Sequence, residues 1–291
     1  MDLREQFGAT TTALLDERSD VALVYAEISG QYFRGARERH PDRVVNVRIR
    51  EQLLVSVGGG LALAGIRPVV HTFSAFLVER AFEQVKLDLA HQGVGAVLVG
   101  AGGSFDMAPL GRTHQSPGDV ALLSTIPGIT IHAPSTAEEV DATLRLAAAD
   151  TGLHYVRVSG LRNSTSHAAG PTLHVARRGD GPTILALGHV LDDVLAAAEQ
   201  VDATVLYATQ VLPLDEQTLR AYAGQDVVVV EPWHEGTSAH AVSAALADRP
   251  HRLLSIGTRH DELRHYGSPR EHADAHGLTA PRLAARISAW L

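Results

Sequence analysis

The chain has 291 residues, about twice the length of a typical domain of ~150 residues, so two domains are expected. Hydrophobic residues make up 45% and charged residues 20%, as in ordinary globular proteins, which excludes an intrinsically disordered chain. The 25 Lys and Arg residues are outnumbered by 33 Asp and Glu residues, for a net charge of −8. This balance excludes partner classes that depend on a basic surface, such as nucleic acid and anionic lipid.

Cysteine is absent, which excludes disulfides, thiolate metal sites and cysteine nucleophiles and is typical of a reducing cytoplasm. No run approaches the ~18 apolar residues that a membrane span needs, and the first residues lack an apolar signal segment. We therefore expect a cytoplasmic protein with no membrane contact. The 16 histidines are scattered, and none shows the HExxH spacing of a zinc site, so no metal ligands are predicted.

The first part of the chain alternates short β-branched runs with Ala- and Leu-rich segments of helical length, a pattern typical of a mostly parallel sheet flanked by helices. The helix at 137–150 follows Ser135, which we expect to cap it, with Glu138 three residues on. The expected strands are 21–25, 44–47, 68–72, 96–99, 130–132 and 154–158, and the expected helices are 2–16, 50–64, 75–91 and 137–150.

Between residues 161 and 182 the composition turns to polar residues, glycine and proline, which indicates a linker. Beyond it strands are expected at 183–187, 203–207, 226–230 and 253–255, and helices at 191–201, 215–222 and 238–248. The fold class is therefore α/β with two domains, each a mostly parallel sheet flanked by helices. We place them at 1–168 and 183–291, joined by a linker at 169–182.

A few side chains stand where open α/β sheets place ligands, at the carboxyl ends of strands. Glu51 follows the strand 44–47 and begins a helix, although a lone acid there is more often a solvated residue favoured by the helix dipole. Phe73 and Phe76 lie three apart at a strand-to-helix junction, where such pairs usually belong to the core. His114 stands in a polar turn, where a lone histidine is usually a surface residue. Glu27, Arg4, Arg80, Arg157 and Arg162 could equally form local ion pairs.

The order and spacing of these segments carry more information than any one residue. In chain order the sequence reads DRVVNVRIREQ, GLALAGIRPVVHTFSAF, RAFEQ, GRTHQS and IPGITIHAPS, a series that resembles the pyrimidine-binding domain of transketolase. The second half, with VVVVEPWHEGTSAHAV, LLSIGTRHDELRHYG and HGLTAPRLAARI, is similar to the C-terminal domain of the same family. The resemblance covers nearly the whole chain and implies dependence on thiamine diphosphate.

The resemblance also implies roles for these side chains. Glu51 would hydrogen-bond the aminopyrimidine ring of the cofactor and stabilise the tautomer that removes the thiazolium proton. Phe76 would stack on that ring and Phe73 would wall the same pocket. Glu27 and Arg80 would lie at the cofactor, and His114 would face the substrate as a hydrogen-bond donor or proton carrier. Further substrate contacts would come from three arginines, Arg4, Arg157 and Arg162.

The family's diphosphate-binding domain has no counterpart in this chain. Gly179-Asp180-Gly181 imitates its GDG motif, but the tripeptide lies in the linker and no asparagine follows it. The resemblance therefore implies the C-terminal subunit of a split transketolase, with Mg²⁺ and the diphosphate held mainly by a partner, the N-terminal subunit. An α2β2 heterotetramer is the simplest closed assembly.

Two departures from the family pattern concern the substrate, a small sugar or aldehyde. Relatives that act on sugar phosphates often carry an acid four residues before the THQ histidine, where this chain has Leu110. The Ser-Arg-Gln that supplies a phosphate ligand in relatives is also missing, although Arg157 or Arg162 could replace its arginine. These changes favour a less polar or unphosphorylated acceptor.

Two other functions stay open at this stage. One is the beta subunit of a 2-oxo-acid dehydrogenase, or a synthase that decarboxylates pyruvate. The other is a non-catalytic α/β assembly subunit, for which the change at Leu110 is the kind of drift expected. THQS and the RAFEQ helix favour transketolase-like transfer of a two-carbon ketol unit from a ketose-like donor to an aldehyde over the dehydrogenase. The joint presence of Glu51, Phe76 and His114 argues against the non-catalytic subunit.

Overall fold

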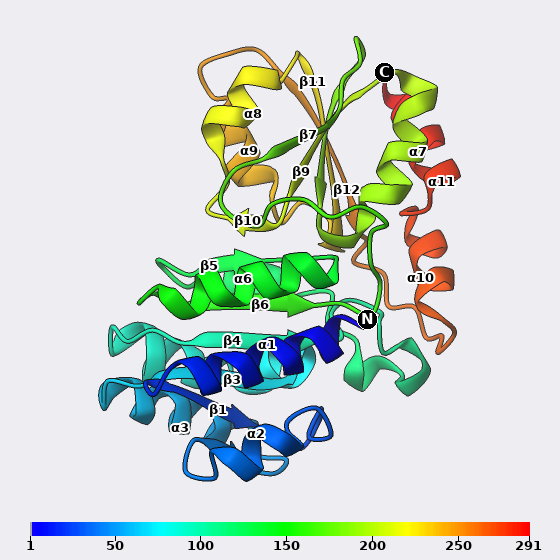
Figure 1. Ribbon diagram of the computed structural model, residues 1–291. Coiled ribbons are helices and arrows are strands. Elements are labelled where there is room, and N and C mark those ends of the chain that lie inside the picture. Colours follow the sequence, from blue (N-terminus) through cyan, green and yellow to red (C-terminus); the bar gives the residue numbers. More distant parts are fainter. Residues whose placement is uncertain (1) are drawn as a thin grey trace.

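The computed structural model describes residues 2–291 and contains two mostly parallel sheets, stacked one above the other in Figure 1. The first sheet has seven strands in the order β10-β5-β6-β4-β3-β1-β2, and the second has five in the order β12-β11-β8-β9-β7. In each sheet one edge strand is antiparallel, β10 in the first and β7 in the second. The predicted fold class, α/β with two helix-flanked parallel sheets, is confirmed.

The strands of the first sheet are buried β-branched runs, as expected where helices cover both faces of a parallel sheet. They are β1 (Val21–Tyr25), β2 (Val44–Asn46), β3 (Arg67–Phe73), β4 (Val97–Ala101), β5 (Thr130–His132), β6 (His154–Val158) and β10 (Gln210–Leu212). The connecting helical segments are α1 (Leu3–Glu17), α2 (Arg34–Arg39), α3 (Glu51–Leu63), η1 (Ala75–Arg80), α4 (Phe82–Gln84), η2 (Val85–His91), η3 (Ala108–Leu110), η4 (Arg112–His114), α5 (Asp119–Leu123) and α6 (Ala137–Ala149).

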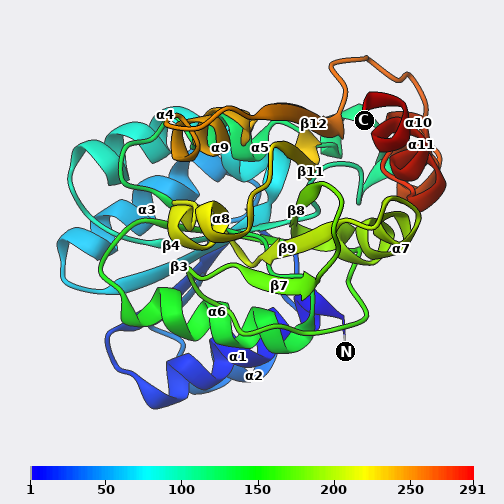
Figure 2. The same ribbon diagram turned by 90° about the horizontal axis from the view of Figure 1, so that it is seen from above.

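Helices cover both faces of this sheet. Figure 2 shows α1, α2 and α6 below β3 and β4, and α3 and α4 above them. On the α1 side the core is formed by residues such as Phe7 and Phe33, and on the α3 side by residues such as Leu54 and Leu77. The sheet is therefore closed to water on its faces and open only at its strand ends, which is where loops present side chains to ligands.

The second sheet repeats the strand–helix alternation with the remaining residues. Its helix α10 begins with a complete capping box, in which Ser268 and Glu271 each bond the other's backbone, and ends at Gly277 in a left-handed conformation. The elements are β7 (His174–Arg177), β8 (Thr183–Leu187), η5 (Gly188–Val190), α7 (Leu191–Val201), β9 (Thr204–Ala208), α8 (Glu216–Tyr222), β11 (Asp226–His234), α9 (Ala239–Ala245), β12 (Arg252–Thr258), α10 (Pro269–His276) and α11 (Ala280–Trp290).

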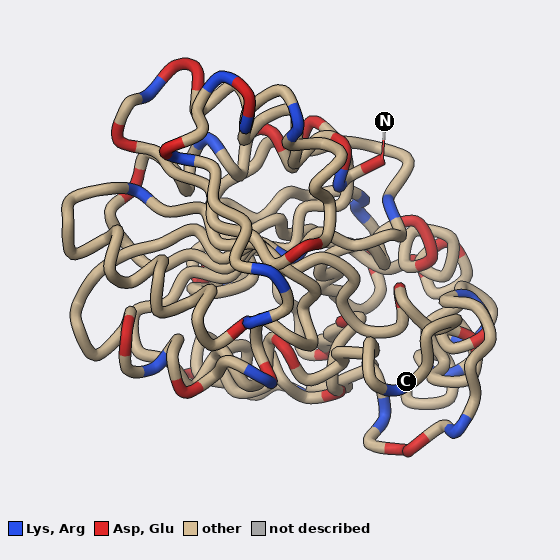
Figure 3. Tube along the Cα trace, turned by 90° about the horizontal axis from the view of Figure 1, so that it is seen from below, with Lys and Arg blue, Asp and Glu red and all other residues tan. Residues whose placement is uncertain are grey.

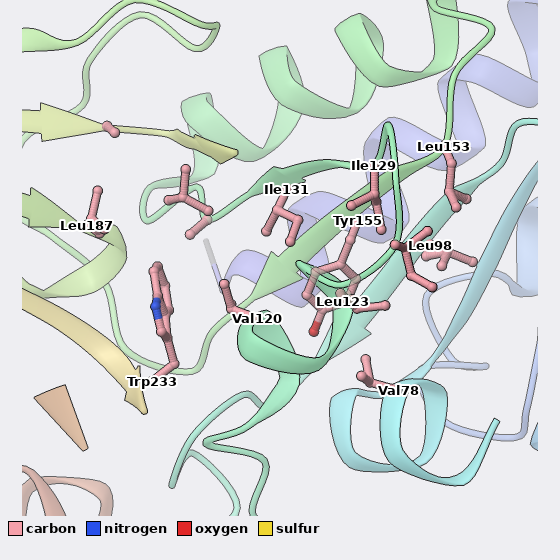
Figure 4. Close-up of a cluster of buried hydrophobic side chains, with 14 of the residues drawn as sticks. Val78, Leu98, Val120, Leu123, Ile129, Ile131, Leu153, Tyr155, Leu187 and Trp233 are labelled. Carbon is pink, nitrogen blue, oxygen red and sulfur yellow. The ribbon is translucent and has the colours of Figure 1, made fainter. Parts of the chain in front are cut away.

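The two sheets share one hydrophobic core. Trp233 and Leu187 of the second sheet belong to the same buried cluster as Val120, Ile131 and Tyr155 of the first, and Figure 4 shows these side chains lying in the space between the sheets. Strand β10, which follows β9 in the chain, pairs with β5 of the first sheet. The two halves are therefore fixed to each other by packing and by backbone pairing.

Several local features differ from the sequence expectations, and α2, α10, α11 and β10 were not expected at all. The linker expected at 169–182 contains the strand β7, which pairs with β9. The long helix expected at 75–91 is broken at Ala81 into η1, α4 and η2. The cap of α6 is Thr136, whose hydroxyl accepts from the backbone N–H of Glu139, so the prediction of Ser135 was wrong by one residue. Sequence patterns rarely fix the end of an element to a single residue.

Acidic and basic side chains are interspersed along the chain (Figure 3). Many of them form local ion pairs, such as Arg220 with Asp248 and Arg286 with Glu235. None of the helices among residues 2–291 combines the length and apolarity that crossing a bilayer requires.

Candidate functional site

The carboxyl ends of four neighbouring parallel strands carry most of the predicted site residues. Glu27 follows β1, Glu51 follows β2, and Phe73 ends β3 with Phe76 one turn later in η1. His114 lies on the loop that follows β4. Since these strands are adjacent in the order β4-β3-β1-β2, their ends form one edge, and the side chains beyond them share one region of the surface.

Glu51 is buried, with 2% of its surface exposed, although it is the first residue of α3. Its carboxylate oxygen Oε2 accepts a hydrogen bond from Nη1 of Arg80 at 2.5 Å. The positive end of the helix dipole and the guanidinium both favour a negative charge at this place. The other carboxylate oxygen, Oε1, accepts no hydrogen bond from a residue between 2 and 291, so Glu51 retains an acceptor for an incoming donor.

Three aromatic rings are linked to this carboxylate through Arg80. The ring centroids of Phe73 and Phe76 are 5.9 Å apart, and His114 lies 5.5 Å from Phe73 and 4.9 Å from Phe76, all with edge-to-face geometry. Arg80, which holds Glu51, stacks its guanidinium 4.0 Å from the centre of the Phe76 ring. The structure therefore brings Glu51, Phe73, Phe76, Arg80 and His114 into one continuous set of contacts, called here the edge cluster.

Glu27 stands at the same edge in a different set of contacts. It adopts a left-handed backbone conformation with φ of 60° and accepts hydrogen bonds from Arg48 Nη1 and from Asn46 Nδ2, both at 3.1 Å. Arg48 also has a positive φ, of 62°. Two non-glycine residues in this rare conformation indicate a loop fixed by its surroundings. The contact with Glu27 gives Arg48 a local role that the sequence did not suggest.

Arg157 forms its contacts with residues outside the edge cluster, inside the protein, which argues against its predicted contact with substrate. Its Nε donates to Asp119 Oδ2 at 2.8 Å and its Nη2 to the Ser104 hydroxyl at 2.6 Å, and the Tyr155 hydroxyl donates to the same Asp119 oxygen. The Trp233 ring of the second sheet lies 5.5 Å from the guanidinium carbon. Only 2% of Arg157 is exposed, so its charge is neutralised inside the protein and faces no solution ligand.

The two other predicted substrate arginines lie elsewhere. Arg4 is half-buried in the first turn of α1, on the sheet face opposite α3 (Figure 2). Arg162 follows β6 and lines a cleft together with Thr136, Asn163 and Asp192, next to the second domain. The roles of Arg4 and Arg162 therefore remain predictions. Leu110, where relatives often have an acid, is 52% exposed on η3, close in sequence to His114.

Two titratable groups near this edge have shifted pKa values. Burial lowers the pKa of His71 to about 4, and its ring nitrogens lie 2.9 Å from the Val99 carbonyl and 3.0 Å from the Ser29 hydroxyl, so it stays neutral. Burial raises the pKa of Asp106 to about 6, although it accepts hydrogen bonds from the backbone N–H of Gly160 and the hydroxyl of Ser159. His71 precedes Phe73 by two residues on β3 and packs against the rings of Phe7 and Phe33, so it supports the strand that carries Phe73.

Sequence reasoning missed the network around Arg157. The only signal available was the acid Asp119 after a proline turn, and such a residue looks like any helix-starting acid. Its pairing with a strand residue 38 positions away depends on the β4-β6 neighbourhood, which no local pattern encodes.

Two family models match this chain, one in each half. The profile described as "Transketolase, pyrimidine binding domain" matches residues 1–161, and the profile "Transketolase, C-terminal domain" matches residues 172–283. The chain belongs to the transketolase family. A relative at 42% identity, an uncharacterized 33.6 kDa protein in the fasciation locus of Rhodococcoides fascians, aligns with all of this chain and 95% of its own length.

Longer relatives match over part of their length. The 1-deoxy-D-xylulose-5-phosphate synthase of Thioalkalivibrio sulfidiphilus is 32% identical over 87% of this chain, which spans 41% of that enzyme. Among solved structures, a split-gene transketolase described as an inactive beta4 tetramer has a TM-score of 0.87 at 24% identity and matches over 98% of its length. Transketolase from Campylobacter jejuni has a TM-score of 0.79 at 17% identity, with 46% of its length covered. The fold of this chain is thus that of roughly half of a full-length transketolase.

Proposed function

We propose that this chain is the pyrimidine-binding subunit of a two-chain, thiamine-diphosphate-dependent transketolase that moves a two-carbon ketol unit from a ketose-like donor to an aldehyde. The observation that carries the proposal is the buried carboxylate of Glu51, set at a helix N-terminus beside Phe76 and His114. A buried acid with a free oxygen beside aromatic rings fits the aminopyrimidine half of the cofactor, which offers ring faces for stacking and polar ring atoms for hydrogen bonds.

Each residue of the edge cluster would have a separate role toward the cofactor or the substrate. Glu51 would share a proton with a pyrimidine ring nitrogen and keep that ring in the tautomer that the reaction needs. Phe76 would offer its face to the ring, and Phe73 would close the side of the pocket. When bound, thiamine diphosphate supplies the nucleophilic carbon that carries the two-carbon unit.

Arg80 would contact the cofactor ring next to Glu51, and His114 would contact the substrate. Arg80 now occupies one oxygen of Glu51 and covers the Phe76 ring, so the cofactor ring would have to displace the guanidinium from that face. His114, whose Nδ1 lies 2.9 Å from the Thr113 hydroxyl, would present its other nitrogen to the substrate and donate or carry a proton there. Glu27, held by Arg48 at the end of β1, would line the cofactor pocket.

A second subunit is proposed to hold the diphosphate and its Mg²⁺. In support, this chain spans 41% of the synthase and 46% of the Campylobacter jejuni transketolase, and the two profiles that it matches are those of the pyrimidine-binding and C-terminal domains. Ile49 and Leu53, which flank Glu51, are 69% and 44% exposed. Exposed apolar side chains beside a buried acid suit a surface that a partner covers. An α2β2 assembly would close such contacts symmetrically.

The substrates are proposed to be less polar than sugar phosphates. An isobutyl group at Leu110 cannot replace a carboxylate that hydrogen-bonds a donor hydroxyl. Arg157 forms a buried ion pair with Asp119, so it would not bind a phosphate. Both features favour an unphosphorylated acceptor.

A pyruvate-decarboxylating synthase is the second candidate, because the 1-deoxy-D-xylulose-5-phosphate synthases of Thioalkalivibrio sulfidiphilus and Neisseria meningitidis serogroup C are 32% and 31% identical to this chain. In those enzymes too this chain covers less than half of the length. The two candidates would share the edge cluster and differ in whether the donor loses carbon dioxide.

The test is to mix the chain with a candidate partner that carries a diphosphate-binding domain, together with thiamine diphosphate and Mg²⁺. Products are analysed with ketose donors and a panel of aldehydes, and carbon dioxide release from pyruvate is measured in parallel. Ketose-dependent extension of an aldehyde by two carbons supports the proposal, and carbon dioxide release without a ketose supports the synthase. Glu51→Gln should lower the rate by roughly 10²–10⁴-fold, whereas the exposed neighbour Glu83→Gln should leave it unchanged.

A further inference from the structure

A cleft between the two domains lies outside the edge cluster. It has a volume of about 230 Å³ and is lined by residues of the loop after β4 and of the segment that follows β12. Figure 1 shows that segment, in orange, beside the teal loop of the first domain. None of Glu51, Phe73, Phe76 and His114 lines the cleft. It is therefore a separate feature of the surface, although it lies directly behind the turn that carries His114.

One wall of the cleft holds a buried polar side chain with no partner. Gln115 is 2% exposed, and its Nε2 donates no hydrogen bond to any residue between 2 and 291. His234, across the cleft, has an unpartnered Nδ1 and stacks on His260 with ring centroids 4.1 Å apart. Unpaired buried donors are costly, so they indicate a place where an acceptor binds.

Two arginines complete the wall. Nε of Arg112 lies 3.2 Å from Oε1 of Glu262, and Nε of Arg259 lies 3.2 Å from Oδ2 of Asp261. The side chains of these pairs are all between 49% and 56% exposed, so the pairs contribute little and can be opened by a competing anion. Guanidinium groups offer several N–H donors each, and a phosphate or carboxylate group is the acceptor that matches them.

We propose that this cleft binds a compact oxyanion, a phosphate or dicarboxylate group, held by Gln115, His234, His260 and the two arginines Arg112 and Arg259. Gln115 would donate through Nε2, the histidines through ring N–H groups, and the arginines from both sides of the cleft. Arg112 begins the 3₁₀ turn that ends at His114, and its Nη1 already donates to the Gln115 carbonyl at 3.2 Å. A bound anion would thus join the second domain to the turn that presents His114. The site does not depend on the transketolase activity of the chain.

The experiment measures thermal unfolding of the full chain in sodium chloride, inorganic phosphate and malonate at equal ionic strength. Saturating anion is expected to raise the melting temperature by roughly 2–5 °C. A rise with phosphate alone assigns a phosphate-bearing ligand, and a rise with malonate alone assigns a dicarboxylate. No rise with either anion would overturn the proposal.

Variants locate the effect. Gln115→Leu removes the unpartnered amide with little change of volume, and His260→Phe keeps the ring stack but removes its donors. Each variant should bind the anion more weakly, so that the half-saturating anion concentration rises tenfold or more. The control Gln217→Leu, an exposed glutamine on α8, should behave as the native chain. A rise that persists unchanged in both cleft variants would place the anion elsewhere and refute the site.

Discussion

Removing the Arg157 side chain should destabilise the protein strongly. Arg157→Met deletes the guanidinium and keeps the length of the apolar stem, leaving Asp119 as a fully buried carboxylate with the Tyr155 hydroxyl as a donor. The side chains of the pair are 1% and 0% exposed and 2.8 Å apart. Breaking such a pair from one side costs about 3–5 kcal/mol, because the remaining charge stays buried and uncompensated.

The double variant Arg157→Met, Asp119→Leu separates this cause from a simple packing defect. With both charges replaced by apolar side chains, the loss should shrink to about 2 kcal/mol or less. Urea unfolding followed by tryptophan fluorescence, from Trp233 beside Arg157 and from Trp290 in α11, reports both variants. Because two domains need not unfold in one step, a second probe such as circular dichroism should be compared with it.

Two results would refute this reasoning. One is a loss below about 1 kcal/mol for Arg157→Met, which would mean that water or another group compensates Asp119. The other is an unchanged stability with a raised KM in the reconstituted enzyme, which would restore the substrate role that the sequence suggested.

Three further predictions concern the edge cluster and its support. Phe76→Ala should raise the thiamine diphosphate concentration for half-maximal activity of the reconstituted enzyme by roughly two- to tenfold, because it removes a ring stack worth about 0.5–1.5 kcal/mol. The control Phe82→Ala should leave this concentration unchanged, and equal effects of the two variants would argue against stacking at position 76. Leu110→Asp should raise kcat/KM for polyhydroxylated ketose donors by about tenfold, checked by steady-state kinetics, and an unchanged value would place position 110 away from the donor. The pKa of His71 is lowered to about 4, so as the pH falls below 6.5 the unfolded chain binds a proton that the folded chain does not, and the folded state loses stability. Between pH 7 and pH 5 the free energy of unfolding, measured in urea, should fall by about 2 kcal/mol more for the native chain than for His71→Gln. Equal falls in the two proteins would contradict a neutral buried ring.

Much of the fold could be predicted from periodicity alone. The strands 21–25, 130–132, 154–158 and 183–187 begin and end where the buried β-branched runs do. The two antiparallel edge strands, β7 and β10, were not predicted. Strand β10 is three residues long and forms only because β5 offers an unpaired edge, and β7 sits in a polar segment whose residues are all half-buried. Such edge strands depend on tertiary pairing and leave little trace in local composition.

The edge cluster was predictable for a different reason. Phe73 ends a strand, and Glu51, Phe76 and His114 each lie beyond one. Parallel strands bring their carboxyl ends together, so the topology gathers these residues. Arg157 also lies on a strand, but in its interior, where a charged side chain must find a buried partner. Its partner, Asp119, depends on the packing of α5 between the two domains, which the sequence pattern does not reveal.

The most direct test of the two-chain account is a calorimetric titration of thiamine diphosphate, with Mg²⁺ present, into this chain, into the diphosphate-domain protein, and into their mixture. We expect tight binding of one cofactor per pair of chains in the mixture only, weakened when Glu51 is replaced by Gln. Full-affinity binding by this chain alone, unaltered by the second protein, would contradict the claim that the cofactor is shared between two polypeptides.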